Sequence, residues 1–142
     1  MMKWAELSDK ERVRLVLQHV MGCFVLEATS TGWRTPEHPR GYDAVAIGFH
    51  WPIAFWNTDG ECWMTRDIAT DPIFFNPLHD MNDAWEVIEH TLQHAPLPNN
   101  LDFIHWLDRL HLWGLSKAYV LEHINVLALR AFGVEIDVRR KQ

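Results

Sequence analysis

Cysteine and positive charge are both scarce in this sequence. Its 142 residues include only two cysteines, Cys23 and Cys62, and no CxxC pair, so we expect neither a disulfide framework nor a cysteine zinc site. Thirteen Lys and Arg stand against nineteen Asp and Glu, a formal charge of −6. Proteins that bind the phosphate backbone of nucleic acids are usually basic, and we therefore expect no direct binding of duplex DNA.

Long apolar runs are also missing. No stretch approaches the roughly 18 apolar residues that a membrane-spanning helix needs, and residues 1–7 lack the apolar segment of a secretory signal. Together with the low cysteine content, these absences predict a cytoplasmic protein with no membrane partner. A chain that is 48% hydrophobic and 23% charged is typical of one folded domain, which we take as residues 1–142.

The usual motifs of enzymes are absent as well. The seven glycines are scattered and form no phosphate-binding loop, and the sequence contains no GxSxG and no HExxH. Both cysteines lie in apolar, strand-like surroundings, where a thiol is usually inert. The sequence therefore favours a protein that acts without catalysis, and we predict no catalytic residue and no cofactor.

The first half of the chain is predicted to be a helix followed by strands. Ser8 and Glu11 form an S-x-x-E capping box, and apolar residues recur at helical spacing until a stop at Gly22. A hairpin is expected around Asp59-Gly60, because aromatic runs lie on both sides of that turn. The segments predicted as strands, the last of them as a short edge strand or buried segment, are 23–28, 44–49, 53–56, 62–65 and 73–75.

Three helices are predicted in the second half. Asp80 is the expected N-cap of the first, and the last begins after Ser116 and stops at Gly133. Between them, residues 101–113 repeat their apolar side chains at intervals of three and four, which favours a helix over a strand. The apolar stripe that we expect the first helix to bury is Met81, Ala84, Trp85, Ile88 and Leu92. This order of elements predicts an α+β protein, an antiparallel sheet packed between helices as an α-β-α sandwich.

Five segments of the chain resemble, in the same order, those of a known family. They are Val20-Met21-Gly22, residues 56–60, 75–77 and 80–89, and the Ala-Leu-x-Ala-x-Gly-Val-Glu pattern of residues 128–135. Over residues 8–136 the sequence is similar to the phage ABA sandwich domain, a family of small phage and prophage proteins. It departs from the family at 101–113, where the family has strands. The resemblance implies an α-β-α sandwich, a phage origin and the cytoplasm of a bacterial host, and it implies no catalytic residue.

Histidine is abundant, with nine residues. Glu86, His90 and His94 follow one another at intervals of four, so neighbouring pairs can face one ion from the same side of a helix. They lie away from the expected apolar stripe, and a solvated polar face explains them more simply. We therefore predict no metal site and keep these three residues as weak candidates for one.

The eight tryptophans are the second excess. Trp33 and Arg34 place an aromatic ring beside a guanidinium on an expected loop, a pair that can stack on a nucleobase and hold a phosphate. The same pair can anchor a protein interface, where Trp and Arg are enriched. With Arg40 and Trp56 they are our predicted binding residues, although a place in the core explains Trp56 at least as well.

An acidic block extends from Asp59 to Glu89. It contains eight acidic residues against Arg66 alone, a net charge of −7. Such a block can imitate a row of phosphates and occupy the basic groove of a host protein. More commonly an acidic face only keeps a protein soluble. From this block we take Asp67 and Asp71 as predicted binding residues.

Three functions are left open by the sequence. The first is a non-enzymatic phage or prophage accessory protein that acts against a bacterial defence system by binding a host protein through the acidic block or an aromatic patch. The alternative is a sponge that sequesters a signalling nucleotide in a pocket of aromatic and arginine side chains, as a monomer or a homo-oligomer. The second alternative is a metal-dependent enzyme that uses some of the histidines.

Overall fold

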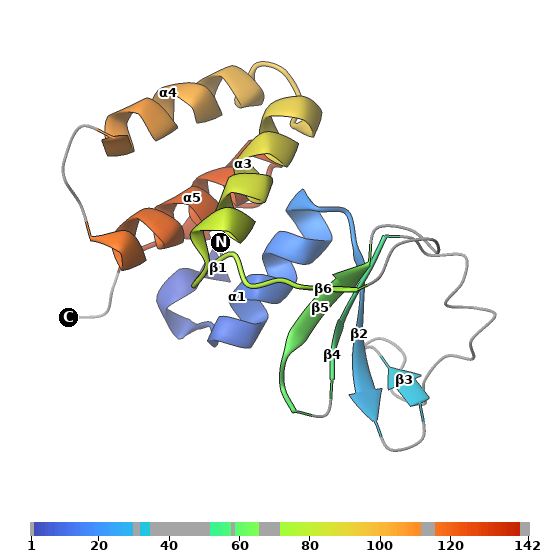
Figure 1. The fold of residues 1–142 in the computed structure, drawn as a ribbon. Helices are drawn as coiled ribbons and strands as arrows, with labels where there is room; N and C mark the ends of the chain where they lie inside the picture. The colour runs from blue at the N-terminus through green and yellow to red at the C-terminus, as the bar shows by residue number, and fades with distance from the viewer. Residues whose placement is uncertain are drawn as a thin grey trace. The chain divides into compact units, whose positions relative to one another are not determined.

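The helices and strands of this protein fall into two compact units (Figure 1). Unit 1 contains residues 1–21 and 76–142, and unit 2 contains residues 22–75. Helices dominate the described part of unit 1 and strands that of unit 2, which confirms the α+β class, whereas the sandwich arrangement stays a prediction. The structure is a computed structural model that describes residues 2–29, 32–34, 52–57, 59–65, 72–111 and 116–139.

Unit 1 begins with a short strand and the predicted N-terminal helix. The strand β1 (Met2–Lys3) pairs in parallel with β7 (Ile136–Asp137), which brings the two ends of the unit together. A single 3-10 turn, η1 (Trp4–Glu6), leads to α1 (Asp9–Leu15), and α1 continues directly into the π-helical segment η2 (Val16–Val20).

The capping box predicted at the start of α1 is confirmed. The Glu11 backbone N–H donates to the Ser8 hydroxyl at 3.2 Å, and the Ser8 backbone N–H donates to the Glu11 carboxylate at 3.4 Å. Gly22 ends this part of the chain with a φ of +67°, in the left-handed region that glycine adopts without strain. The apolar residues expected on the inner face are buried: Val13, Val16, Leu17, Val20 and Met21.

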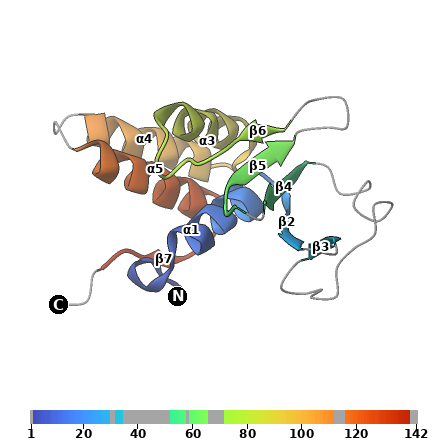
Figure 2. The same cartoon turned by 60° about the horizontal axis from the view of Figure 1, so that its bottom comes forward.

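The three helices of the second half contact one another and lie side by side (Figure 1 and Figure 2). They are α3 (Met81–His94), α4 (Asn99–His111) and α5 (Lys117–Ala131). Asp80 and Ser116 accept hydrogen bonds from backbone N–H groups in the first turns of α3 and α5, so both predicted N-caps are confirmed. The helical interpretation of residues 101–113 is confirmed as far as α4 extends.

The helix α5 supplies much of the core of unit 1, because it contacts α3, α4, η2 and β7. Its one fully buried polar side chain is Asn125, which donates to the carbonyls of Leu121 at 2.7 Å and Pro77 at 2.9 Å. The second of these bonds joins α5 to the segment that precedes α3. The buried apolar residues of α5 are Leu121, Ile124, Val126, Leu127, Ala128, Leu129 and Ala131.

The apolar stripe predicted for α3 is wrong in part. Ala84 and Ile88 are buried as expected, together with Val87 and Thr91. Small side chains explain the difference, because Ala84 and Thr91 allow neighbouring elements to approach α3 closely. The Thr91 hydroxyl donates to the Val87 carbonyl at 2.7 Å, so its burial leaves no unpaired polar group. The exposed members of the predicted stripe are Met81, Trp85 and Leu92.

Unit 2 contains a five-stranded sheet in the order β3-β2-β4-β5-β6. The hairpin predicted around Asp59-Gly60 is confirmed, with β4 and β5 paired and Gly60 at a φ of +80°. The strand predicted at 44–49 lies outside the described residues. The bounds of the strands are β2 (Phe24–Thr29), β3 (Gly32–Arg34), β4 (Ile53–Trp56), β5 (Cys62–Thr65) and β6 (Ile73–Phe74).

The sheet is mixed. Three of its four strand pairs are antiparallel as expected, whereas β2 and β4 run parallel. A parallel pair needs a crossover of roughly a dozen residues or more, and the chain between β3 and β4 is long enough to supply it. The expected edge strand is confirmed by β6, which pairs with β5 alone among the described strands.

The capping box of α1 gives the first prediction. Replacing Ser8 by Ala removes the acceptor of the Glu11 N–H, and we expect the free energy of unfolding to fall by about 1 kcal/mol. Urea unfolding followed by circular dichroism measures this change. A Ser8→Thr variant keeps an acceptor at the same place and should retain most of the stability. Equal stability of Ser8→Ala and the unchanged protein would contradict the prediction.

Candidate functional site

The six residues that the sequence proposed for binding all fall in unit 2. Trp33 and Arg34 belong to the edge strand β3, which pairs with β2, so the loop expected there is a strand; their side chains lie outside what the structure describes. The Trp56 side chain is 5% exposed, which favours its interpretation as a core residue over a stacking platform. The remaining predicted binding residues fall outside the described part of the chain: Arg40, Asp67 and Asp71.

The weak metal candidates lie along α3 as their spacing predicts. The rings of His90 and His94 are neighbours, with centroids 4.3 Å apart, and His90 also stacks near Phe132 at 6.5 Å. Glu86 is half-buried one turn earlier. In the part of the chain that the structure describes, no three His, Cys, Asp or Glu side chains come together in a way that could hold a metal ion.

The acidic block is divided between the two units. Asp59 and Glu61 belong to unit 2, and the acidic residues from Asp80 onward belong to unit 1. Asp83 accepts a hydrogen bond from the Asn76 backbone N–H at 2.8 Å. Partial burial raises the pKa of Asp83 above its ordinary value of 3.8, and this hydrogen bond opposes the rise. Asp80 caps the start of α3, and Asp83 connects its first turn to the segment before the helix.

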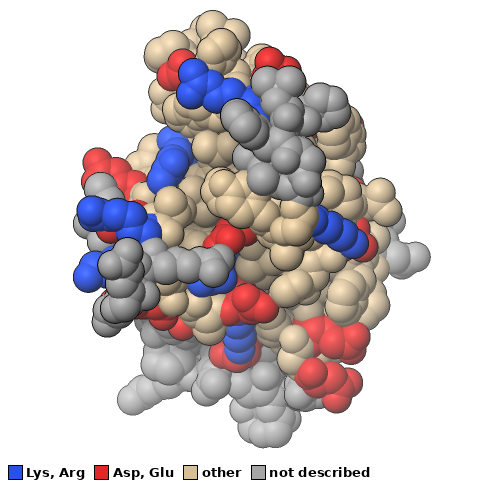
Figure 3. Space-filling model, turned by 90° about the vertical axis from the view of Figure 1, so that its left-hand side faces the viewer, with Lys and Arg blue, Asp and Glu red and all other residues tan. Residues whose placement is uncertain are grey.

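Charge is mixed on the face of the molecule that Figure 3 presents. Lys and Arg side chains alternate there with Asp and Glu across a broad uncharged surface. The described residues on this face therefore form no continuous field of one sign. Within α3, by contrast, Asp and Glu are present but Lys and Arg are not.

One side of α3 carries an exposed apolar surface. We define the α3 surface as Met81, Trp85, Glu89 and Leu92, which the helical repeat places on one side. All four are exposed, and the Trp85 side chain is 58% exposed. Exposed apolar groups that cluster in this way mark interaction surfaces more often than single exposed residues do.

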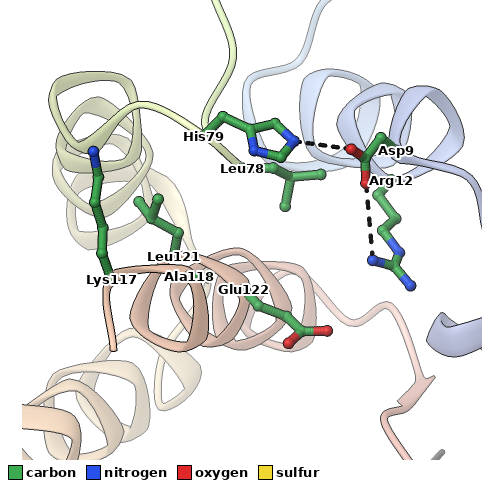
Figure 4. Close-up of a pocket in the computed structure, with 8 residues that line it drawn as sticks. All are labelled: Asp9, Arg12, Leu78, His79, Lys117, Ala118, Leu121 and Glu122. Carbon is green, nitrogen blue, oxygen red and sulfur yellow. Dashed lines mark hydrogen bonds and ion pairs between the residues drawn. The ribbon is translucent and has the colours of Figure 1, made fainter. Parts of the chain in front are cut away.

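Unit 1 also contains a hollow of about 450 Å³ (Figure 4). Three segments that are far apart in the sequence form it: the first turn of α1, the residues just before α3, and the first two turns of α5. Its apolar lining comes from Leu78, Ala118 and Leu121. Charged and titratable side chains surround that apolar lining: Asp9, Arg12, His79, Lys117 and Glu122.

A hydrogen-bonded network holds one wall of the hollow. The His79 ring nitrogen Nε2 lies 2.9 Å from the Asp9 carboxylate, and the Arg12 guanidinium lies 4.0 Å from the other oxygen of that carboxylate. Arg12 also donates twice to the Trp4 carbonyl, at 2.8 and 3.1 Å. The Trp4 indole N–H donates to Glu122 at 2.9 Å. The network therefore connects α1, α5 and the segment before α3.

Both thiols are buried, which agrees with the prediction that the two cysteines are packing residues. Desolvation by burial raises the pKa of Cys23 from its ordinary value of 9.0 to about 12. A thiol reacts as its thiolate, so Cys23 is protonated and unreactive at neutral pH. This environment is the opposite of the electropositive, partly exposed setting that activates a cysteine nucleophile.

Comparison of the chain with protein-family models, with curated proteins and with solved structures found no match. The resemblance to the phage ABA sandwich domain therefore stays a prediction from the sequence. Among the described residues, no helix combines the length and the apolar character needed to cross a membrane.

No pattern in the sequence indicates the hollow. Its residues share no motif, because they come from three separate parts of the chain. The one signal available was that they lie close to the predicted N-caps Ser8, Asp80 and Ser116. Which helix starts lie beside one another is a property of the tertiary structure, and the spacing of residues within each helix carries no information on it.

The burial of Cys23 gives the second prediction. Iodoacetamide should modify Cys23 far more slowly in the native protein than in urea, as measured by mass spectrometry of the labelled peptide. The unfolded thiol ionises near pH 9.0 while the folded thiol keeps its proton to about pH 12. The unfolded state therefore binds fewer protons in that window, and stability should fall as the pH rises through it.

A Cys23→Ala variant is the control for this pH dependence. It should lose less stability between these two pH values than the unchanged protein, because the buried thiol no longer contributes. Equal rates of alkylation in the native and unfolded protein would show that the thiol is accessible and would contradict the prediction.

Proposed function

We propose that this protein acts without catalysis, as a phage or prophage accessory protein that binds a host protein through the α3 surface. The exposed ring of Trp85 is the observation that carries the proposal. The phage origin and the action against a bacterial defence system rest on the sequence resemblance alone and are part of the proposal.

Trp85 has the properties of an interface anchor. A tryptophan presents a large, rigid apolar area, and tryptophan is among the residue types that contribute most to binding when a partner buries them. More than half of the Trp85 side chain is exposed to solvent, whereas Trp4 and Trp56 are buried in their own units. Met81 and Leu92 extend the apolar area along the helix, so a partner pocket can cover all three.

The charge of α3 indicates the kind of partner. The helix carries Asp83, Glu86 and Glu89 and no Lys or Arg, and its N-cap is Asp80. Of these acidic residues, Asp80 and Glu89 are exposed. Exposed acidic groups beside an apolar anchor favour a partner whose pocket is apolar and has Lys or Arg at its rim. This is the arrangement expected for a protein that competes for a basic groove of a host protein.

The aromatic edge of unit 2 supports the proposal less well. Phe74 is exposed on β6, but its ring packs against Trp63 of the neighbouring strand with centroids 5.5 Å apart in a T-shaped arrangement. Part of its area is therefore already covered within the sheet. The nucleotide sponge stays an alternative prediction, because Trp33, Arg34 and Arg40 have no described side chains.

Truncation of the anchor gives the third prediction. Trp85→Ala should weaken binding of the partner by at least about tenfold, or about 1.4 kcal/mol, because the partner pocket loses the ring that fills it. The partner is first isolated from a lysate of the bacterial host, and the affinity of the purified pair is then measured by calorimetry.

Leu101→Ala is the matched control for this experiment. Leu101 has the same exposed fraction as Trp85, 58%, but lies on α4 outside the α3 surface. The Leu101→Ala variant should leave the affinity for the partner unchanged, and both variants should unfold at the same urea concentration as the parent. A partner that binds Trp85→Ala as tightly as the parent would overturn the proposal.

Reversal of charge beside the anchor gives the fourth prediction. Glu89→Lys should slow association with a partner of basic rim and reduce its salt dependence, because exposed charges act mainly on the rate of encounter. Stopped-flow measurements at low and high salt test this. The control is Glu135→Lys, which makes the same change of charge at an exposed site of unit 1 outside the α3 surface. If both variants slow association equally, the response is non-specific and the prediction is contradicted.

A further inference from the structure

The hollow in unit 1 has no part in the function proposed for the α3 surface. We propose that it binds a small organic anion, an apolar body the size of one ring that carries a carboxylate or phosphate group held by Lys117. The size of the hollow, its lining and the engagement of its other polar groups all favour such a ligand.

The hollow has the dimensions and lining of a small-ligand site. Its volume of about 450 Å³ lies within the range of roughly 300–1,000 Å³ that such sites occupy. Leu78 and Leu121 lie between the charged side chains, as Figure 4 shows, and form a nearly buried apolar floor. Ala118 is exposed and adds the apolar area that a ligand can cover. An apolar body that rests on these side chains removes apolar area from water.

The two carboxylates of the hollow already have donors. Asp9 lies 2.9 Å from the His79 ring nitrogen, and Glu122 accepts the indole N–H of Trp4 at 2.9 Å. The Arg12 guanidinium, which would otherwise attract an anion, donates twice to the Trp4 carbonyl. These groups therefore hold the wall of the hollow in place, and both carboxylates and the guanidinium are engaged in contacts within the protein.

Lys117 differs from the other charged groups of the hollow. It is exposed and makes no hydrogen bond or ion pair with any residue that the structure describes. In Figure 4 it extends along the side of the hollow opposite Arg12, with Leu78 and Leu121 between them. Its ammonium group is thus positioned to hold the charged end of a ligand whose apolar body covers the two leucines.

The position of Lys117 strengthens its preference for an anion. It is the first residue of α5, and the first turn of α5 contains no acidic residue. The positive end of the helix dipole lies there, where a cation is unfavourable and an anion is stabilised. A bound carboxylate or phosphate therefore neutralises two positive contributions at once, and the lysine supplies the direct contact.

The proposal is tested on the full chain with four probes that share one aromatic ring: benzoate, phenyl phosphate, benzyl alcohol and benzylamine. Isothermal titration calorimetry should detect one or both anions, with dissociation constants on the order of 1 mM or below, and neither neutral nor cationic probe. Tighter binding of benzoate identifies a carboxylate ligand, and tighter binding of phenyl phosphate identifies a phosphate ligand.

Three variants assign the binding to this hollow. Lys117→Met should weaken binding of the anion by about tenfold or more, while Lys3→Met makes the same change of net charge away from the hollow and should have no effect. Ala118→Trp fills the hollow from an exposed helix position without removing a charge and should abolish binding.

The outcomes decide the proposal clearly. It is overturned if neither anion binds, if benzylamine binds as tightly as benzoate, or if Lys117→Met and Ala118→Trp bind the anion as the parent does. Because the α3 surface takes no part in these titrations, their failure leaves the function proposed for Trp85 unaffected, and the reverse also holds.

Discussion

The arrangement of unit 1 depends on the burial of Trp4. Trp4 is only 1% exposed, and both its indole N–H and its carbonyl reach partners on other elements. The indole N–H donates to Glu122 of α5, the carbonyl accepts from Arg12 of α1, and the Arg12 guanidinium lies over the ring at 4.9 Å. Burial of an indole without a hydrogen-bond partner is costly, so these contacts determine how η1, α1 and α5 meet.

The contacts of Trp4 have consequences for both proposed sites. By holding the first turn of α1 against the start of α5, they create the hollow and engage Arg12 and Glu122 as parts of its wall. Lys117 is left as the charged group that faces the hollow without a partner among the described residues. In α3, the buried residues are Ala84, Val87, Ile88 and Thr91, whereas its largest residue, Trp85, is exposed. This exposed apolar area is the one that we propose a partner covers.

Local features of the fold were predicted well from the sequence. Ser8, Asp80 and Ser116 each accept backbone hydrogen bonds at a helix start, because capping depends on residues within one turn of each other. The β4–β5 hairpin was predicted for the same reason. The parallel pairing of β2 with β4 and the exposed side of α3 were not predicted. The periodicity of a helix shows that it is amphipathic but leaves open which neighbouring elements cover each of its sides.

The sequence by itself therefore determined the α+β class, the N-caps Ser8, Asp80 and Ser116, the hairpin and the buried environment of the cysteines. The tertiary structure alone decided that Trp56 is core, that Trp85 is exposed, and that Asp9, His79 and Lys117 share one hollow. The physical reason is the distance along the sequence over which each kind of interaction acts. Caps, turns and amphipathic repeats arise from interactions between residues a few positions apart, whereas burial and the meeting of distant side chains depend on how whole elements pack against one another.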